Sequence, residues 1–356
     1  MNGTTQSISQ KLELPPGIPA QPYVLQSLCG EIIYIPCSRS ATRLLVTGKE
    51  SDNAFAVVGS GGAQSAPIGF HYHNDAHDVF LCIKGQVNVW AGDQARTLEP
   101  GDFASVPPKT IHQYQILGNH TEFLGLIVPG GWEEFFRFIG EPYAGPMFPL
   151  SDDRNVFEVL IPKLKAAAEK FDMVPCPRHP QFDPQPWTGT ENRLSGALEP
   201  YFLRKGSGPA YLAGGAIVRP LATTAESGGR FTVASIEGSS FHKNASIFAQ
   251  SPVGITFDST HHCFQVSDGA VAFTLQETEM VLSVGETIYI PQGSVFKFEF
   301  VTRFAQVYVF TNGVGLSELM IRAGKGCKIE IPPEKATPVE AAKLGDLKKE
   351  LGFEFS

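Results

Sequence analysis

The residues best suited to chemistry lie between positions 69 and 85, in the segment GFHYHNDAHDVFLCIKG. His71 and His73 are two residues apart, a spacing that places both imidazoles on one face of a β-strand. Asp78 is expected to bring a carboxylate to the same interior, and His112 follows a strand and a turn of its own. A His-x-His pair alone is more often structural, but these four residues together predict a site for one divalent transition metal ion. Fe, Cu, Ni, Mn and Co all accept such ligands, so the identity of the metal stays open.

The elements that must position these residues are mainly strands. Residues 20–130 contain short runs of β-branched and aromatic residues between turn signals, which is typical of an antiparallel sandwich or barrel. Helical periodicity appears at 132–140 and 155–171, and a proline-rich stretch follows it. The strand pattern then returns, and residues 338–353 predict one amphipathic helix. The fold class is therefore expected to be all-β, with a helical linker and a C-terminal helix.

The two strand-rich halves share a local pattern, which indicates duplication. Gly85 is followed 16 residues later by Gly101, and Gly269 is followed 16 residues later by Gly285. Counting from these glycines places Ile255, Phe257, His262 and Phe296 at the positions of the four candidate ligands. One histidine among Ile and Phe cannot hold a catalytic ion, so the second half is expected to be structural.

This repeat predicts two domains joined by a connecting segment. We expect an N-terminal metal-binding domain at 1–150, a helical and proline-rich linker at 151–200, and a C-terminal domain without metal ligands at 201–356, which ends in a helix. The oligomeric state stays open, and a homodimer is one option.

Composition excludes several classes of partner. The formal net charge is −8 and no basic run occurs, so nucleic acid and anionic membrane surfaces are not expected partners. No stretch reaches the roughly 20 apolar residues that span a bilayer. The first residues show no secretory signal, and the six cysteines form no C-x-x-C pair. We therefore expect a cytoplasmic protein with reduced thiols.

These residues resemble the two sequence motifs of the cupins. His71, His73, Asp78 and Gly85 match the motif G-x5-H-x-H-x3–4-E-x6-G, and Gly101, Pro107 and His112 match G-x5-P-x-G-x2-H-x3-N. The chain departs from these motifs at Ser65, Lys109 and Ile116, where the patterns have Gly, Gly and Asn.

The layout over roughly residues 20–335 is similar to the quercetin 2,3-dioxygenase family of bicupins. The resemblance implies two cupin (jelly-roll β-barrel) domains, a metal-dependent dioxygenase activity, and a glutamate that approaches the metal and takes a proton from the substrate. Asp78 stands in its place and is shorter by about 1.5 Å, one C–C bond, so its role as ligand, base or both stays open. The resemblance also implies a pocket tyrosine at Tyr34. Phe80, Phe103 and Tyr114 are candidate pocket residues by type, although core packing explains them equally well.

The leading functional hypothesis is ring cleavage of a flavonol or another enolisable aromatic or polyketide with O2. A first alternative is a metal-dependent enzyme that does not use O2 and acts as an isomerase, decarboxylase, cyclase or lyase on an intracellular secondary metabolite. A second alternative is a non-catalytic bicupin that binds or stores a ligand.

Overall fold

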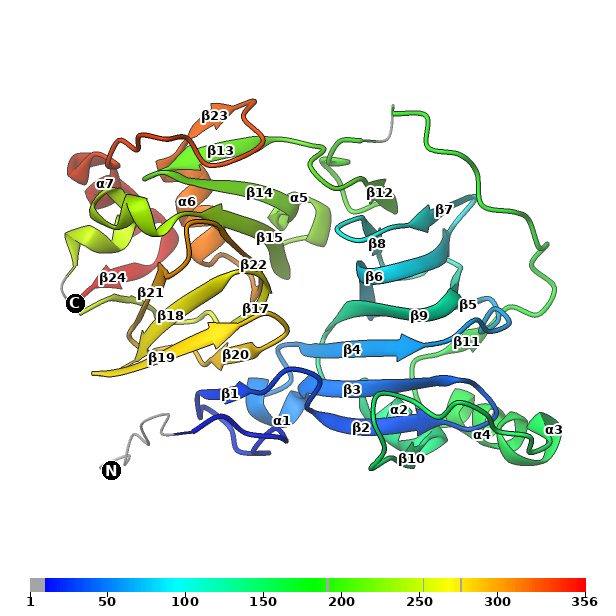
Figure 1. The fold of residues 1–356 in the computed structure, drawn as a ribbon. Coiled ribbons are helices and arrows are strands. Elements are labelled where there is room, and N and C mark those ends of the chain that lie inside the picture. Colours follow the sequence, from blue (N-terminus) through cyan, green and yellow to red (C-terminus); the bar gives the residue numbers. More distant parts are fainter. Residues whose placement is uncertain (1–9, 190–191, 252, 276) are drawn as a thin grey trace. The chain divides into compact units, whose positions relative to one another are not determined.

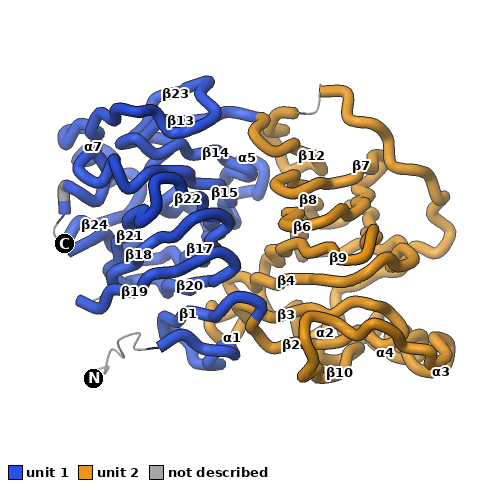
Figure 2. Tube along the Cα trace, viewed as in Figure 1, with its two compact units in different colours: residues 1–28, 208–356 blue, residues 29–207 orange. Residues whose placement is uncertain are grey.

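The computed structural model describes residues 10–189, 192–251, 253–275 and 277–356 (Figure 1). The chain divides into two compact units, and each consists mainly of strands (Figure 2). Residues 29–207 form one unit, called the first domain below. Residues 1–28 and 208–356 form the other, called the second domain. No helix in the described ranges has both the length and the apolar content to cross a membrane.

The first domain contains a continuous path of paired strands in the order β10-β2-β3-β4-β9-β6-β8-β12, with β5, β7 and β11 attached beside it. Its elements are β2 (Glu31–Ile35), β3 (Ser40–Val46), α1 (Gly48–Ser51), β4 (Ala56–Gly62), β5 (His71–Tyr72), β6 (His77–Ala91), β7 (Gln94–Leu98), β8 (Phe103–Val106), β9 (His112–Val128), α2 (Glu134–Ile139), β10 (Glu141–Pro142), α3 (Val156–Val159), α4 (Ile161–Lys170), β11 (Val174–Pro175) and β12 (Tyr201–Leu203).

The second domain contains two sheets, in the orders β1-β20-β17-β22-β15-β14-β13-β23 and β19-β18-β21-β16-β24. Its elements are β1 (Tyr23–Leu25), β13 (Ala210–Ala213), β14 (Ala216–Ala222), α5 (Thr224–Ser227), β15 (Phe231–Gly238), η1 (Ser240–Ala245), η2 (Ile247–Gln250), β16 (Ile255–Phe257), β17 (His262–Asp268), β18 (Ala270–Leu275), β19 (Thr278–Ser283), β20 (Thr287–Ile290), β21 (Phe296–Phe300), β22 (Ala305–Asn312), α6 (Leu316–Ala323), β23 (Lys325–Cys327), α7 (Ala341–Leu351) and β24 (Phe353–Phe355). The expected closing helix is α7, and a short strand, β24, follows it and pairs with β16.

The boundaries of the two units differ from those expected from the sequence, because two strands pair with strands that are distant in the chain. β1 adds to β20, so residues 23–25 belong to the second domain. β12 adds to β8 in the same way, so residues 201–203 belong to the first domain. The segment expected to be a linker, 151–200, is part of the first domain. Backbone pairing between distant segments decides these boundaries, and composition does not reveal it.

A repeated helix cap supports the duplication. Thr47 and Glu50 form a capping box at α1, in which the Glu50 carboxylate accepts from the Thr47 amide at 2.9 Å. Thr223 and Glu226 form the same box at α5, with the corresponding bond at 2.8 Å. This reciprocal cap satisfies amide groups that the first helical turn leaves without partners. The same local solution therefore occurs at matching places in both domains.

Gly85 and Gly269 show why the repeat keeps glycine at one position. Their φ angles are +70° and +66°, in the left-handed region that glycine adopts without a steric penalty. A Cβ on Gly85 would lie 2.2 Å from Thr121 Oγ1, and one on Gly269 would lie 2.3 Å from Thr302 Oγ1. Both the backbone angle and the close approach therefore require glycine.

Candidate metal centre

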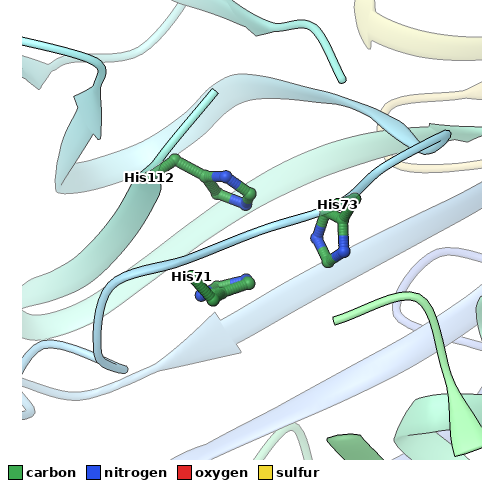
Figure 3. Close-up of side chains that lie close together, drawn as sticks. All are labelled: His71, His73 and His112. Atoms are coloured by element: carbon green, nitrogen blue, oxygen red, sulfur yellow. The ribbon is translucent and has the colours of Figure 1, made fainter. Parts of the chain in front are cut away.

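The strands of the first domain bring together three histidines that are far apart in the sequence. His71 lies on β5, His73 follows that strand, and His112 begins β9 directly opposite His71. Their rings gather at one place (Figure 3), with centroids 4.3 Å apart for His71 and His112 and 5.1 Å apart for the other two pairs. One nitrogen from each ring lies within 4.8 Å of the others.

Backbone carbonyls fix the orientation of all three rings. Nδ1 of His71 donates to the Gly69 carbonyl at 2.9 Å, and Nδ1 of His112 donates to the Thr110 carbonyl at 2.9 Å. Nδ1 of His73 donates to the carbonyl of Asp172. Because a carbonyl only accepts, Nδ1 carries a proton in each ring, and a neutral ring then keeps its lone pair on Nε2. This is the tautomer in which a histidine ligates a metal through Nε2.

Asp78 supplies negative charge beside two of these lone pairs. Its Oδ2 lies 3.2 Å from Nε2 of His73 and 3.2 Å from Nε2 of His112. Burial acts to raise the pKa of Asp78, but the charges and hydrogen bonds of His73 and His112 hold it well below its usual range. The carboxyl group is therefore ionised, and the shorter side chain of Asp still reaches the histidines.

The donor set fits a bound cation. Nε2 of His73 is buried and has no hydrogen-bond partner of ordinary geometry among the described residues. When His73 is neutral with Nδ1 protonated, its Nε2 and the Asp78 carboxylate are two acceptors that face each other, which is unfavourable unless a proton or a metal cation lies between them. Imidazole nitrogen with one carboxylate oxygen suits the divalent transition metals named above.

Burial keeps His71 in the form that a metal requires. It lowers the pKa of His71 to about 3, and the charges of His112 and His73 act in the same direction. For His73, burial acts to lower the pKa, but Asp78 and the Asp172 carbonyl raise it above its usual value. His71 therefore stays neutral near pH 7, which leaves its Nε2 free to ligate.

Phe80 and Tyr114 lie on the same face as the candidate ligands. Phe80 is two residues after Asp78 on β6, and Tyr114 is two residues after His112 on β9, so each pair shares a face. Their rings are 5.8 Å apart. Burial raises the pKa of Tyr114 to about 12, and the charge of Asp78 adds to this shift. These two predicted residues line the interior beside the histidines.

Tyr34 does not lie on that face. Strand pairing links Ile33 to Cys82 through Thr42, Ser60 and Phe123, so these side chains lie on one face of the sheet. Cys82 is four residues after Asp78 on β6, so this is also the face of Asp78. Tyr34, one residue after Ile33, therefore points to the other side of the sheet, where its hydroxyl donates to Asp152 at 2.5 Å. The expectation of a pocket tyrosine at this position is wrong.

Phe103 is also on the other face. Phe103 pairs with Leu81, whose side chain points to the opposite face of β6 from those of Phe80 and Asp78. Its ring is fully buried and lies 6.0 Å from that of Tyr201. Phe103 therefore packs on the face away from the histidines.

Two further residues, Asp172 and Trp132, contact His73, and only the aromatic type of Trp132 pointed to either of them. The Asp172 carbonyl accepts from Nδ1 of His73 and, at 3.3 Å, from the indole of Trp132. The Trp132 ring also lies edge-on to His73 at 4.8 Å. Asp172 follows α4 and is 99 residues from His73, so no local pattern links them.

Lys109 occupies the position of the second motif's glycine with a strained backbone. Its φ is +66°, and its amide donates to the His73 carbonyl at 2.6 Å. A residue other than glycine costs about 1–2 kcal/mol in the left-handed conformation. Glycine removes this cost, but part of the gain in stability is lost because glycine makes the unfolded chain more flexible.

We expect Lys109→Gly to increase the free energy of unfolding by about 0.5–1 kcal/mol, because it removes this strain. Urea titration would measure the change. Lys109→Ala is the matched control, since it removes the exposed side chain and keeps the strain. Equal stability of the Gly and Ala variants would contradict the argument.

The equivalent place in the second domain is filled with aromatic rings. Ile255 pairs with Phe296, as His71 pairs with His112 in the first domain. Phe257 and His262 lie next to them, with ring centroids 4.8 Å apart. Nε2 of His262 accepts from the Leu316 amide at 3.1 Å, where α6 begins. This histidine serves the fold of the second domain.

Comparison with known proteins agrees with this fold. Residues 58–126 match the family described as Cupin domain. Quercetin 2,3-dioxygenase of Bacillus subtilis (strain 168) is 36% identical over 45% of this chain and 46% of its own length, so this match spans less than half of that relative. Quercetin 2,3-dioxygenase of Aspergillus japonicus is 29% identical over 80% of this chain and 87% of its own length. The crystal structure of protein Ylba from E. coli has a TM-score of 0.52 at 10% identity and covers 92% of this chain and 98% of that one.

The family match at residues 58–126, the two strand-rich units and the histidine cluster agree with a fold of two cupin domains. Within that class, the chain is quercetin 2,3-dioxygenase-like in sequence. The all-β fold class with two cupin domains and a few helices is confirmed.

Proposed function

We propose that this chain is a metal-dependent dioxygenase that cleaves the ring of a flavonol-like or other enolisable aromatic or polyketide substrate with O2. The relatives named above support a cupin enzyme of this kind. The observation that carries the proposal is the cluster of three histidine nitrogens, with the Asp78 carboxylate 3.2 Å from Nε2 of two of these residues.

His71, His73, His112 and Asp78 would hold the metal ion. When bound, a divalent transition metal there supplies a Lewis-acid centre and a site for oxygen chemistry. The contribution of the protein is fixed geometry, because a backbone carbonyl orients each imidazole before substrate arrives.

Asp78 is the group placed to take a proton from the substrate. Its carboxylate is ionised, and its side chain is 14% exposed. Removal of the hydroxyl proton gives an enolate, which is the electron-rich form of the substrate that reacts with O2. The position of Asp78 therefore favours it as the general base, although its low pKa makes its carboxylate a weak base.

Phe80 and Tyr114 would contact the flat faces or edges of an aromatic substrate. Their rings form a cluster with Phe123, at centroid distances of 5.1–5.8 Å. Such a wall excludes water and favours stacking of a planar ligand. An apolar aromatic substrate fits this wall better than a small charged acid.

Quercetin is the probe for the first test. We expect metal-loaded protein to consume one O2 per quercetin in an oxygen electrode. The product should carry both atoms of labelled O2 and lack one carbon, which leaves as carbon monoxide. Anaerobic incubation with the same protein is the control and should leave quercetin unchanged.

Other outcomes distinguish the alternatives. Turnover of an enolisable substrate without O2 uptake would refute the oxygenase and favour an isomerase, decarboxylase, cyclase or lyase. Quercetin binding with no turnover, together with substoichiometric content of every metal tested, would favour a non-catalytic binding protein.

A further inference from the structure

Asp172 lies outside the cupin motifs, yet its side chain holds the loop between two candidate ligands. Its Oδ1 accepts from the Asn74 amide at 2.8 Å and from Asn74 Nδ2 at 2.9 Å. Its Oδ2 accepts from the Asp75 amide at 2.8 Å and from the Ala76 amide at 3.4 Å. Three consecutive backbone amides thus converge on one carboxylate, an arrangement that stabilises negative charge.

The loop held by Asp172 sets the distance between His73 and Asp78. Residues 74–77 connect them, and Asn74 and Asp75 are exposed to solvent. Exposed backbone amides bond to water as readily as to protein, so a loop of this kind has little order of its own. The carboxylate supplies charge-assisted bonds that favour one conformation.

The main chain of the same residue orients His73 directly. The Asp172 carbonyl accepts from Nδ1 of His73 and from Nε1 of Trp132. The side chain therefore fixes the loop that follows His73, and the carbonyl fixes the ring of His73. Both contacts come from one residue of the connecting segment.

Asp172 is itself anchored on both sides. Phe171 and Met173 pack with Phe135 and Ala167 in a small core formed around α2 and α4. After Asp172, Val174 and Pro175 form β11, which pairs with Tyr72 and His71 of β5. The helices and β11 together hold Asp172 against the metal-binding loop.

We propose that Asp172 is a positioning residue of the metal centre, which fixes His73 relative to Asp78. The helical segment expected to be a passive linker therefore completes the site. This inference rests on the proposed metal site of residues 71, 73, 78 and 112.

The test compares Asp172→Ala and Asp172→Asn with the wild-type chain, using Co²⁺ as the probe. Both variants keep the backbone carbonyl, so they test the side chain alone. Asp172→Ala should weaken Co²⁺ binding by roughly 10–100-fold, the usual effect of losing an outer-shell partner, and should change the visible spectrum of the bound Co²⁺. Asp172→Asn keeps one acceptor oxygen and should lie between the Ala variant and wild type. Asp153→Ala removes an exposed carboxylate of the same segment and should match wild type.

Hydrogen exchange gives a readout that needs no metal. The amides of residues 74–76 should be protected in the wild-type chain and should exchange faster in Asp172→Ala. Wild-type Co²⁺ affinity and spectrum in Asp172→Ala, or unchanged exchange at residues 74–76, would overturn the inference. Failure of the wild-type chain to bind any divalent transition metal would instead refute the proposed function, while exchange would still decide whether Asp172 orders the loop.

Discussion

His112→Ala is expected to leave the purified protein without stoichiometric metal and without dioxygenase activity. His112 contributes one of three Nε2 atoms, and its Nε2 lies 3.2 Å from Asp78. Alanine offers no ligand atom, so two imidazoles and one carboxylate would remain. The loss of affinity should exceed the roughly 10–100-fold that follows removal of an outer-shell partner. Elemental analysis after dialysis, together with O2 uptake on quercetin, would measure both effects.

A second histidine on β9 provides the matched control. His120 interacts with Lys84 at 3.0 Å and with Glu122 at 2.7 Å, and it does not belong to the histidine cluster. His120→Ala should keep one metal ion per chain. If His112→Ala also kept one metal ion per chain, the assignment of His112 as a ligand would be wrong.

Asp78→Asn is expected to lower kcat by about 10²–10⁴-fold, the usual contribution of a general base. The amide has nearly the same shape as the carboxyl group and keeps one oxygen near His73 and His112, but it cannot accept the substrate proton. The three histidines remain, so the variant should still bind metal, although more weakly. Steady-state kinetics of reconstituted protein, with metal content measured on the same sample, would separate the two effects.

Two further variants sharpen this prediction. Asp78→Glu restores a carboxyl group, and Glu is the residue of the cupin motif, so its activity should exceed that of Asp78→Asn. Asp93→Asn changes an exposed carboxylate in the turn between β6 and β7 and should behave as wild type. A kcat for Asp78→Asn equal to that of wild type would exclude Asp78 as the base.

The candidate pocket residues show where inference from sequence succeeds and where it fails. Alternation along a strand correctly groups Phe80 with Asp78 and Tyr114 with His112, because both pairs are two residues apart on one strand. It cannot tell which face of another strand points inward. That requires the pairing register, and the register turns Tyr34 and Phe103 to the opposite face.

The sequence by itself determined the all-β class, the repeat and the four residues of the candidate metal centre. Each of these depends on local patterns: side-chain type, a spacing of two along a strand, and glycine at turns such as Gly85 and Gly269. Only the tertiary structure decided which strands complete each domain, which aromatic rings face the histidines, and that Asp172 holds the loop after His73. The physical reason is that these features arise from hydrogen bonds and packing between segments far apart in the chain. Residue order records side-chain chemistry and local conformation, but it does not record which distant partner each strand or carbonyl will meet.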